Sequence, residues 1–177
     1  EVSFDGVIVG AEALLGQTGR GFEYAQIRLG PGRLHHCARL VGMGERAIEC
    51  VIERGSSRRA FGKPLLQLGG NLERLARSRV SLQQARLCVL SAAAALDVDD
   101  SHGVHTSKES KFALAVCKVA VPAAVGEVLD FAIQLHGGGG LSSDHPLAAM
   151  LAAARTLRLV DGPDEVHLMS LARAELK

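Results

Sequence analysis

The segment LRLVDGPDEVH, residues 157–167, links an apolar run to a Gly-Pro step and then to a second helical start. It places one carboxylate, Asp161, at the break between two predicted helices. Acidic residues follow in the first turn of the second helix, where the helix dipole favours negative charge. Two interpretations of Asp161 follow. Its side chain can cap the second helix, because Asp is a favoured N-cap residue, or it can reach into a cleft between the two helices.

The composition of the chain on either side of this segment predicts a mainly α fold. The chain has 177 residues and 47% hydrophobic content, which is enough to build a core. Ala, Leu and Val are plentiful, whereas the aromatic residues are five Phe and one Tyr, with no Trp. Such a composition favours close-packed helices over stacked sheets.

Helical periodicity is clearest between about residue 72 and residue 96. Apolar side chains recur there every seven residues, the spacing of long helices packed nearly antiparallel, at Leu75, Leu82, Val89 and Leu96. Long helices with short connections predict an up-down bundle. The other expected helices span about 23–29, 33–54, 107–135, 145–157 and 164–176.

Several residues are expected to interrupt or orient these helices. The Pro31–Gly32 step should end the first helix, and Pro122 should bend the one that contains it, because proline removes a backbone donor and crowds the preceding turn. Residues 97–103 are expected to form an acidic turn. In the segment 107–135, Phe112 and Ala123 are expected to face the core.

Residues 1–9 alternate apolar and polar side chains, a pattern typical of a strand. A lone strand has no partner in a helical chain, so this pattern indicates the end of a β-domain that lies within a larger architecture. The expected division is residues 1–18 as the end of that domain and its connection, and residues 19–177 as the helical bundle.

Several classes of function are disfavoured. The formal net charge of +1, with basic residues spread along the chain, argues against nucleic-acid binding. The four cysteines form no CxxC pair, and His35 and His36 show no ligand spacing, so neither disulfides nor a metal site is expected. The two histidines should face solvent or a neighbouring helix. No apolar run reaches the roughly 18–20 residues of a membrane span, and no signal peptide opens the sequence, which predicts a soluble protein.

The segment QLHGGGGL, residues 134–141, contains more glycine than a helix end requires, since one glycine would suffice. The additional glycines permit close backbone approach to a ligand, such as a phosphate held by amide groups. A flexible loop is the alternative.

Four motifs now occur in a fixed order: GRGF at 19–22, SRRAFGKPL at 57–65, QLHGGGG at 134–140 and VDGP at 160–163. Together they resemble the C-terminal half of an acyl-CoA dehydrogenase, and the resemblance covers essentially the whole chain. It implies a helical bundle that forms an oligomer core, with FAD at a subunit interface. It also implies that the family's N-terminal helical domain and most of its middle β-domain lie upstream.

The resemblance also implies roles for individual residues. Asp161 matches the catalytic base, and Arg33 and Gly162 match positions on the substrate side. Arg58 matches an arginine that meets the FAD pyrophosphate, as a guanidinium fork would. The full set of implied cofactor residues is Arg58, Phe61, Gln134, Gly137, Gly138 and Glu165.

Three positions depart from the usual family pattern. Most members have Glu-Gly-Thr where this chain has Asp161-Gly162-Pro163, so a hydroxyl near the flavin is lost. A glutamine usually found eight residues after Phe61 is replaced here by Gly69, which weakens one expected cofactor contact. Gly32 occupies the place where a minority of members carry an alternative base. The string DGPDEVH itself resembles a branch whose animal members have a fused phosphotransferase-like domain, and related nitroalkane oxidases also use Asp, so aspartate is compatible with catalysis.

Removal of a proton α to a thioester needs a carboxylate within reach of the carbon and shielded from water, which raises its basicity. Leu157, Leu159 and Val160 could provide that apolar setting for Asp161. The β-hydrogen then leaves as hydride to the flavin. The alternatives are a catalytically silent helical assembly domain, or a truncated product, and a related flavin oxidase such as a nitroalkane oxidase.

The partners implied by the resemblance are an acyl-CoA substrate, FAD and an electron-transfer flavoprotein. A homodimer or homotetramer is expected as well, because the apolar helix faces exceed what one three-helix bundle can cover. The implied compartment is the cytoplasm in a bacterium or the mitochondrial matrix in a eukaryote.

Overall fold

The structure is a computed structural model that describes residues 1–102 and 106–176. The described residues are mostly helical, as the composition predicts. The α-helices are α1 (Gly21–Ser57), α2 (Asn71–Ser101), α3 (Lys108–His136), α4 (Leu147–Thr156) and α5 (Asp164–Glu175). Shorter elements connect them: the 3-10 helices η1 (Ala11–Ala13), η2 (Leu65–Gln67) and η3 (Gly137–Leu141), and the strands β1 (Arg59–Ala60) and β2 (Lys63–Pro64).

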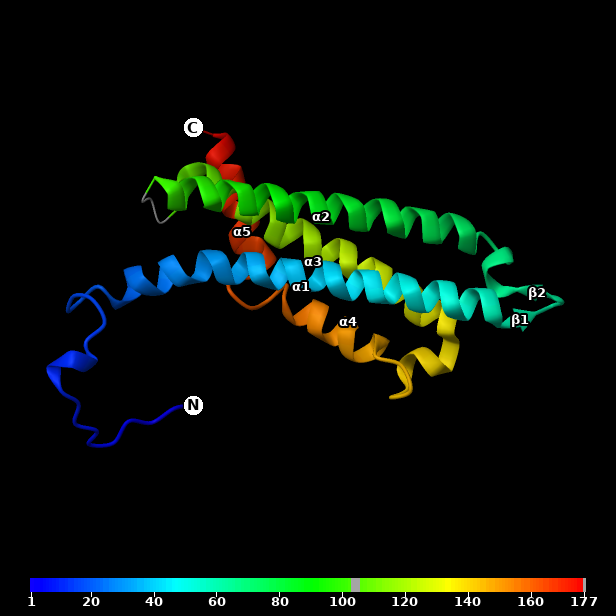
Figure 1. The fold of residues 1–177 in the computed structure, drawn as a ribbon, viewed down its shortest axis with the longest axis horizontal. Helices are drawn as coiled ribbons and strands as arrows, with labels where there is room; N and C mark the ends of the chain where they lie inside the picture. Colours follow the sequence, from blue (N-terminus) through cyan, green and yellow to red (C-terminus); the bar gives the residue numbers. More distant parts are fainter. Residues whose placement is uncertain (103–105, 177) are drawn as a thin grey trace.

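The long helices α1, α2 and α3 lie side by side along the molecule, and α4 and α5 pack against them (Figure 1). Helix α3 is central, because it contacts α1, α2, α4 and α5. The predicted up-down bundle is therefore confirmed. Its core consists of aliphatic side chains contributed by all three long helices, among them Leu40, Ile48, Val51, Leu82, Val121, Val125 and Leu129.

Helix α1 does not break at Pro31, so the predicted interruption is wrong. Proline in a helix interior costs about 3 kcal/mol relative to alanine. The residues that follow Pro31 bury a long apolar stripe against α2 and α3, and that packing holds the helix continuous across the lost hydrogen bond.

The acidic turn predicted at 97–103 is also wrong for residues 97–101, because α2 continues to Ser101, and residue 103 lies outside the described residues. Asp99 lies inside the helix and is buried. Its Oδ2 accepts a hydrogen bond of 2.7 Å from the backbone N–H of Ser107, and Ser107 is the N-cap of α3. The carboxylate therefore joins the end of α2 to the start of α3.

The inward face of α3 differs from the prediction. Phe112 is 41% exposed and Ala123 is exposed, whereas Leu114, Val121 and Val125 are buried. Most residues of this helix are apolar, so periodicity alone does not identify which stripe meets α1 and α2. The arrangement of the neighbouring helices decides it.

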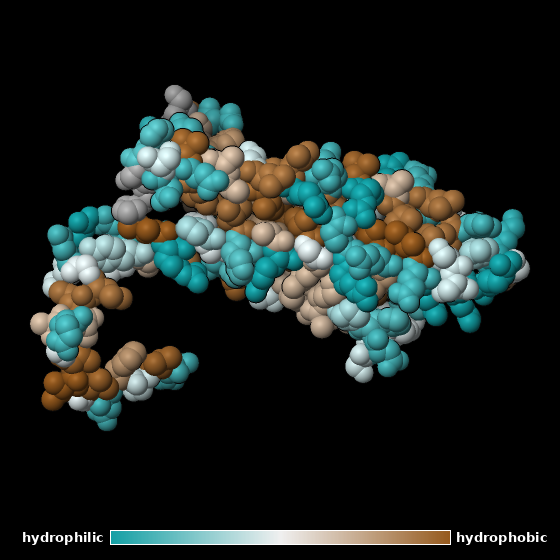
Figure 2. Space-filling view, viewed as in Figure 1, coloured by the Kyte–Doolittle hydropathy of each residue, from teal (hydrophilic) through white to brown (hydrophobic). Residues whose placement is uncertain are grey.

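Residues 1–10 form no strand, and the strand predicted at 1–9 is wrong for this structure. This segment is exposed and stands away from the bundle (Figure 1). The apolar side chains that produced the alternation are visible as brown patches at its surface (Figure 2). A strand requires a neighbouring strand for its backbone hydrogen bonds, and β1 and β2 pair only with each other.

The prediction that no apolar segment is long enough to span a membrane is wrong for one helix. Among the described residues, one helical segment, Lys108–Leu141, is long and apolar enough to cross a membrane by length and composition, with a mean hydropathy of 1.9 over 18 residues. Half of that window is buried inside the structure. The apolar composition follows from the central position of α3, which has helices on several sides.

Candidate active site

The segment between α4 and α5 forms a tight loop with two residues at positive φ. Asp161 has φ +57° and Gly162 has φ +102°. Asp is one of the few residues that tolerates the left-handed region without being glycine. The N-cap of α5 is Pro163, and no side chain caps this helix. The interpretation of Asp161 as a capping residue is therefore wrong, and its carboxylate is available for another role.

Two cations from the bundle hold the backbone of this loop. Lys118 of α3 donates from Nζ to the carbonyl of Leu157 at 2.5 Å and to the carbonyl of Gly162 at 3.3 Å. Arg33 of α1 donates from Nε to the carbonyl of Asp161 at 2.9 Å. The loop is thus anchored through its main chain on both sides of the carboxylate, whose side chain takes no part in the anchoring.

Lys118 is fully buried, with 0% of its surface exposed. Burial is the main cause that lowers the pKa of its ammonium group, and the carboxylates of Asp161 and Asp164 act in the opposite direction. A buried cation needs compensating partners, because removing a charge from water is costly. The two loop carbonyls and the two nearby carboxylates supply that compensation.

The Asp161 carboxylate faces α1. The Nε2 atom of His36 lies 3.2 Å from Oδ2, and the two side chains are 23% and 19% exposed. Oδ2 is buried and makes no hydrogen bond to the described part of the chain, so the His36 contact is electrostatic. A Cβ atom added to Gly32 would lie 3.9 Å from the same oxygen. The same Cβ atom would lie 2.8 Å from Nη1 of Arg28, so the Arg28 side chain occupies the space next to Gly32.

The start of α5 completes this region. Arg158 donates from Nε to Oδ2 of Asp164 at 2.6 Å, an ion pair across the loop. His167 is buried one turn further, and its Nε2 has no hydrogen-bond partner among the described residues. A Cβ atom at Gly162 would lie 3.1 Å from that nitrogen. Space and backbone angle together require glycine at position 162.

A groove of about 430 Å³ runs beside the loop, between the start of α1, the start of α3 and α5. We call it the loop groove. Arg33 and His167 form one part of its wall, so the groove reaches residues that contact the Asp161 loop. Apolar groups from three helices form much of the remaining lining: Ile27, Gly30, Leu114, Ala115 and Val166.

The residues implied in cofactor binding fall into two regions. Glu165 lies on the exposed side of the first turn of α5, close in sequence to Asp161. The others are exposed and lie at the far end of the bundle, where the β1–β2 hairpin and η3 are found (Figure 1). They are Arg58, Phe61, Gln134, Gly137 and Gly138.

Phe61 and Gly62 form the turn of the β1–β2 hairpin, with φ +51° and +77°. Two positive φ angles at a two-residue hairpin turn match the right-handed twist of the paired strands. The ring of Phe61 is 95% exposed. An aromatic ring held out on a tight turn, with no cover from its own chain, is a feature suited to packing against another molecule.

Lys118 and His36 were not identified as site residues from the sequence. Each gives a recognisable signal. Lys118 is a lone cation in an apolar stretch of α3, and His36 lies one helical turn after Arg33 and Gly32, on the same face of α1. The adjacent His35 is exposed. The expectation that the pair faces solvent or a neighbouring helix holds for His35, whereas His36 faces the Asp161 loop.

Residues 19–176 match the family model described as acyl-CoA dehydrogenase, C-terminal domain. The chain belongs to the acyl-CoA dehydrogenase family. The helical bundle described above is the C-terminal helical domain of that family.

Individual family members resemble the chain over its full length. It is 50% identical over 177 residues to the Arabidopsis thaliana protein named probable acyl-CoA dehydrogenase IBR3, covering 100% of this chain and 21% of the relative. A solved structure from Mycobacterium abscessus, assigned as an acyl-CoA dehydrogenase, is 52% identical with a TM-score of 0.87 and covers 98% of this chain and 41% of that chain. Butyryl-CoA dehydrogenase from Megasphaera elsdenii is 30% identical with a TM-score of 0.82, covering 96% and 42%. The chain therefore spans less than half the length of these acyl-CoA dehydrogenases.

Proposed function

We propose that this chain is the C-terminal part of an FAD-dependent acyl-CoA dehydrogenase, in which Asp161 removes the α-proton of an acyl-CoA thioester. The main support is the state of the Asp161 carboxylate. Its loop is held by Arg33 and Lys118 through backbone carbonyls, while Oδ2 is buried and accepts no hydrogen bond from the described residues. A general base needs a fixed position and an oxygen free to accept a proton.

The roles of this chain's residues follow from the contacts around the loop. Arg33 and Lys118 keep the loop at its positive-φ turn, so the carboxylate keeps one location relative to the bundle. The loop groove beside Arg33 offers an apolar wall for the acyl chain. As the Cα–H bond of the substrate breaks, Asp161 takes the proton on a carboxylate oxygen. Arg33 is thus assigned to position the base, and Gly162 to give the loop its shape beside the substrate.

The residues at the hairpin end fit a dinucleotide cofactor. The Arg58 guanidinium is exposed and suits a diphosphate. At Gly137 and Gly138 there is open space where a Cβ atom would stand, so a ligand can approach the backbone closely. Glu165, close in sequence to Asp161, is the remaining residue that we assign to cofactor binding. When bound, FAD supplies the acceptor for the hydride that leaves the β-carbon.

A test of the proposed function uses the protein at its full natural length. Purified protein is mixed without oxygen with acyl-CoA thioesters of different length and branching. We expect loss of flavin absorbance and formation of an enoyl-CoA, lighter than the substrate by two hydrogen atoms, detected by mass spectrometry. Restoration of absorbance by an electron-transfer flavoprotein would identify the physiological acceptor. Bleaching by nitroalkanes but not by thioesters would assign an oxidase instead, and a folded protein without flavin would assign a silent assembly domain.

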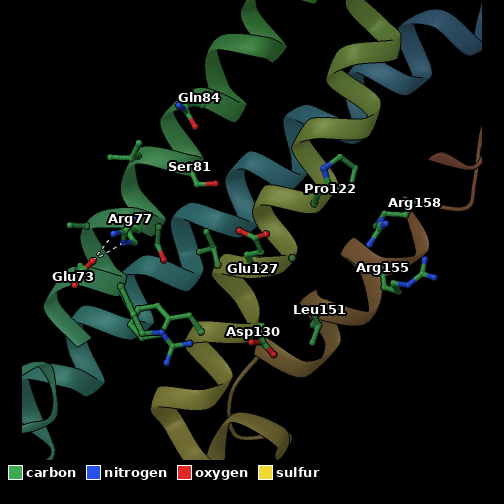
Figure 3. A pocket seen from close by; sticks show the side chains of 18 residues that line it. Glu73, Arg77, Ser81, Gln84, Pro122, Glu127, Asp130, Leu151, Arg155 and Arg158 are labelled. Atoms are coloured by element: carbon green, nitrogen blue, oxygen red, sulfur yellow. Dashed lines mark hydrogen bonds and ion pairs between the residues drawn. The ribbon is translucent and has the colours of Figure 1, made fainter. Parts of the chain in front are cut away.

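We also propose that copies of this chain associate through a second groove, of about 1,100 Å³, between α2, α3 and α4. Figure 3 shows side chains of both charge signs around it, with Glu73 and Arg77 on α2, Glu127 on α3 and Arg155 on α4. Mixed charges on one surface suit pairing with a second copy of the same surface. Helix α2 adds exposed apolar side chains: Leu72, Val80, Leu87, Leu90 and Val98.

The position of the two cofactor regions supports the same proposal. The hairpin end and the Asp161 loop lie at different ends of one copy (Figure 1). A cofactor that contacts residues of both regions is therefore best accommodated between two copies of the chain.

Ala123→Arg is expected to turn a homodimer or homotetramer into a monomer. Ala123 is exposed on α3 and lines the α2–α3–α4 groove, so a charged side chain there disturbs an interface without disturbing the core. Ala38→Arg is the matched control, because Ala38 is an exposed alanine of α1 that does not line the groove. Light scattering at micromolar concentration measures the mass. A monomeric unmutated protein would contradict the proposal.

A further inference from the structure

His36 has a second polar contact besides the one to Asp161. Its Nε2 lies 3.2 Å from the carboxylate Oδ2, and its Nδ1 lies 3.0 Å from Nη2 of Arg39, one turn further along α1. The ring therefore lies between a guanidinium group and the carboxylate assigned as the base.

The Arg39 contact determines where the proton of a neutral imidazole resides. A guanidinium group has N–H donors and no acceptor, so Nδ1 must accept the hydrogen bond. In a neutral ring the proton is then on Nε2, the nitrogen that faces Asp161. The N–H group is thus on the ring nitrogen that lies 3.2 Å from Oδ2, in a dipolar contact without hydrogen-bond alignment, while the ring as a whole carries no charge.

We propose that His36 is a positioning residue for the base: its neutral Nε2–H group holds the Asp161 carboxylate in place, and Arg39 fixes the tautomer that makes this possible. This inference rests on the proposed role of Asp161. It predicts that gain of a second proton by His36 switches the base off, because an imidazolium paired with the carboxylate stabilises its ionised form and lowers its basicity.

The groups that face His36 favour the neutral ring. Burial lowers the pKa of His36, and it is the largest cause. Positive charge on Arg39 and His35 of the same helix and on Lys118 of α3 acts in the same direction, while the carboxylate of Asp161 alone raises the pKa. The imidazole is therefore neutral at neutral pH and becomes charged only on acidification. Activity should accordingly be lost as the pH falls through the pKa of His36.

The rate test compares variants of the full-length holoenzyme over a range of pH. In the unmutated enzyme, the bleaching rate at acid pH should depend on two protonations, so the slope of log rate against pH should approach two. In His36→Asn it should depend on one protonation, and the slope should approach one. At neutral pH the rate of His36→Asn should fall by about ten-fold, because the carboxylate loses its partner. Arg39→Gln removes a positive charge beside His36 and should instead move the acid limb to higher pH.

His35→Asn is the matched control, since His35 is the exposed neighbour of His36 on the same helix, and its rate and slope should stay close to those of the unmutated enzyme. Unchanged slope and rate in His36→Asn would overturn the proposal. An equal effect of His35→Asn would overturn it too, because the response would then belong to the helix surface in general.

A second readout does not depend on catalysis. Hydrogen exchange at the imidazole Cε1, followed by mass spectrometry, reports the pKa of each histidine in the folded protein. Asp161→Asn should lower the pKa of His36 further, because its one stabilising carboxylate is gone, and should leave the pKa of the distant His145 unchanged. If the pKa of His36 does not respond, the contact is absent and the inference is wrong. If it responds but Asp161→Asn still bleaches flavin at the normal rate, the proposed function has failed instead.

Discussion

Asp161→Asn is expected to slow flavin bleaching by acyl-CoA by about 10²- to 10⁴-fold in the full-length enzyme, the usual contribution of a positioned general base. Asparagine keeps the size of the side chain and leaves the backbone carbonyl that accepts from Arg33 intact. Binding of FAD and acyl-CoA should therefore persist. Rapid mixing measures the bleaching rate, and the substrate concentration at half-saturation should change little.

The choice of control for this experiment follows from the structure. Asp164 is an unsuitable control, because it is buried and forms an ion pair with Arg158 whose loss would disturb the loop. Asp144 is exposed and lies in the connection between η3 and α4. Asp144→Asn should bleach at the normal rate. A normal rate in Asp161→Asn would remove this carboxylate from the mechanism.

Lys118→Met is expected to lower both the stability of the protein and the rate of catalysis. Hydrogen bonds to a charged group contribute about 1.5–3 kcal/mol each, and part of this is offset because burial of the ammonium group is itself costly. We therefore expect the free energy of unfolding to fall by about 2 kcal/mol. The loop carbonyls of Leu157 and Gly162 lose their donor, so the base shifts, and a displacement of about 1 Å can cost 10²-fold in rate.

Urea unfolding and single-turnover bleaching measure these two effects separately. Lys108→Met is the matched control, since Lys108 is an exposed lysine at the start of the same helix. It should change neither quantity appreciably. The assigned role of Lys118 requires a slower turnover under conditions where Lys118→Met is still fully folded. A normal turnover there would show that the loop keeps its position without the lysine.

The parts of the fold that depend on local patterns could be predicted from the sequence. The seven-residue repeat from Leu75 to Leu96 lies on the inner side of α2, with Leu82 fully buried and the others packed against the core. The position of Asp161 between two helices was also predictable, because a Gly-Pro step interrupts an apolar run there. Each of these depends on neighbours within a few turns of the chain.

The rest of the site depends on contacts between distant parts of the chain. Arg33 and Asp161 are 128 positions apart, and Lys118 reaches carbonyls 39 and 44 positions away. Residue type alone does not say which carbonyl a lysine or arginine will meet. The failure to predict α1 across Pro31 has the same origin, because packing against other helices outweighs the local preference of proline.

Because α1 and α3 anchor the Asp161 loop, the position of its carboxylate does not depend on segments outside the bundle. Both cations and the histidine beside the carboxylate come from one folded unit, so the location of the Asp161 carboxylate is fixed by that unit. Segments added or exchanged elsewhere in a longer protein can reshape what is held against the carboxylate without relocating it. If Asp161 acts as proposed, the bundle can be transferred between proteins together with its carboxylate, and substrate preference can be redesigned around that fixed group.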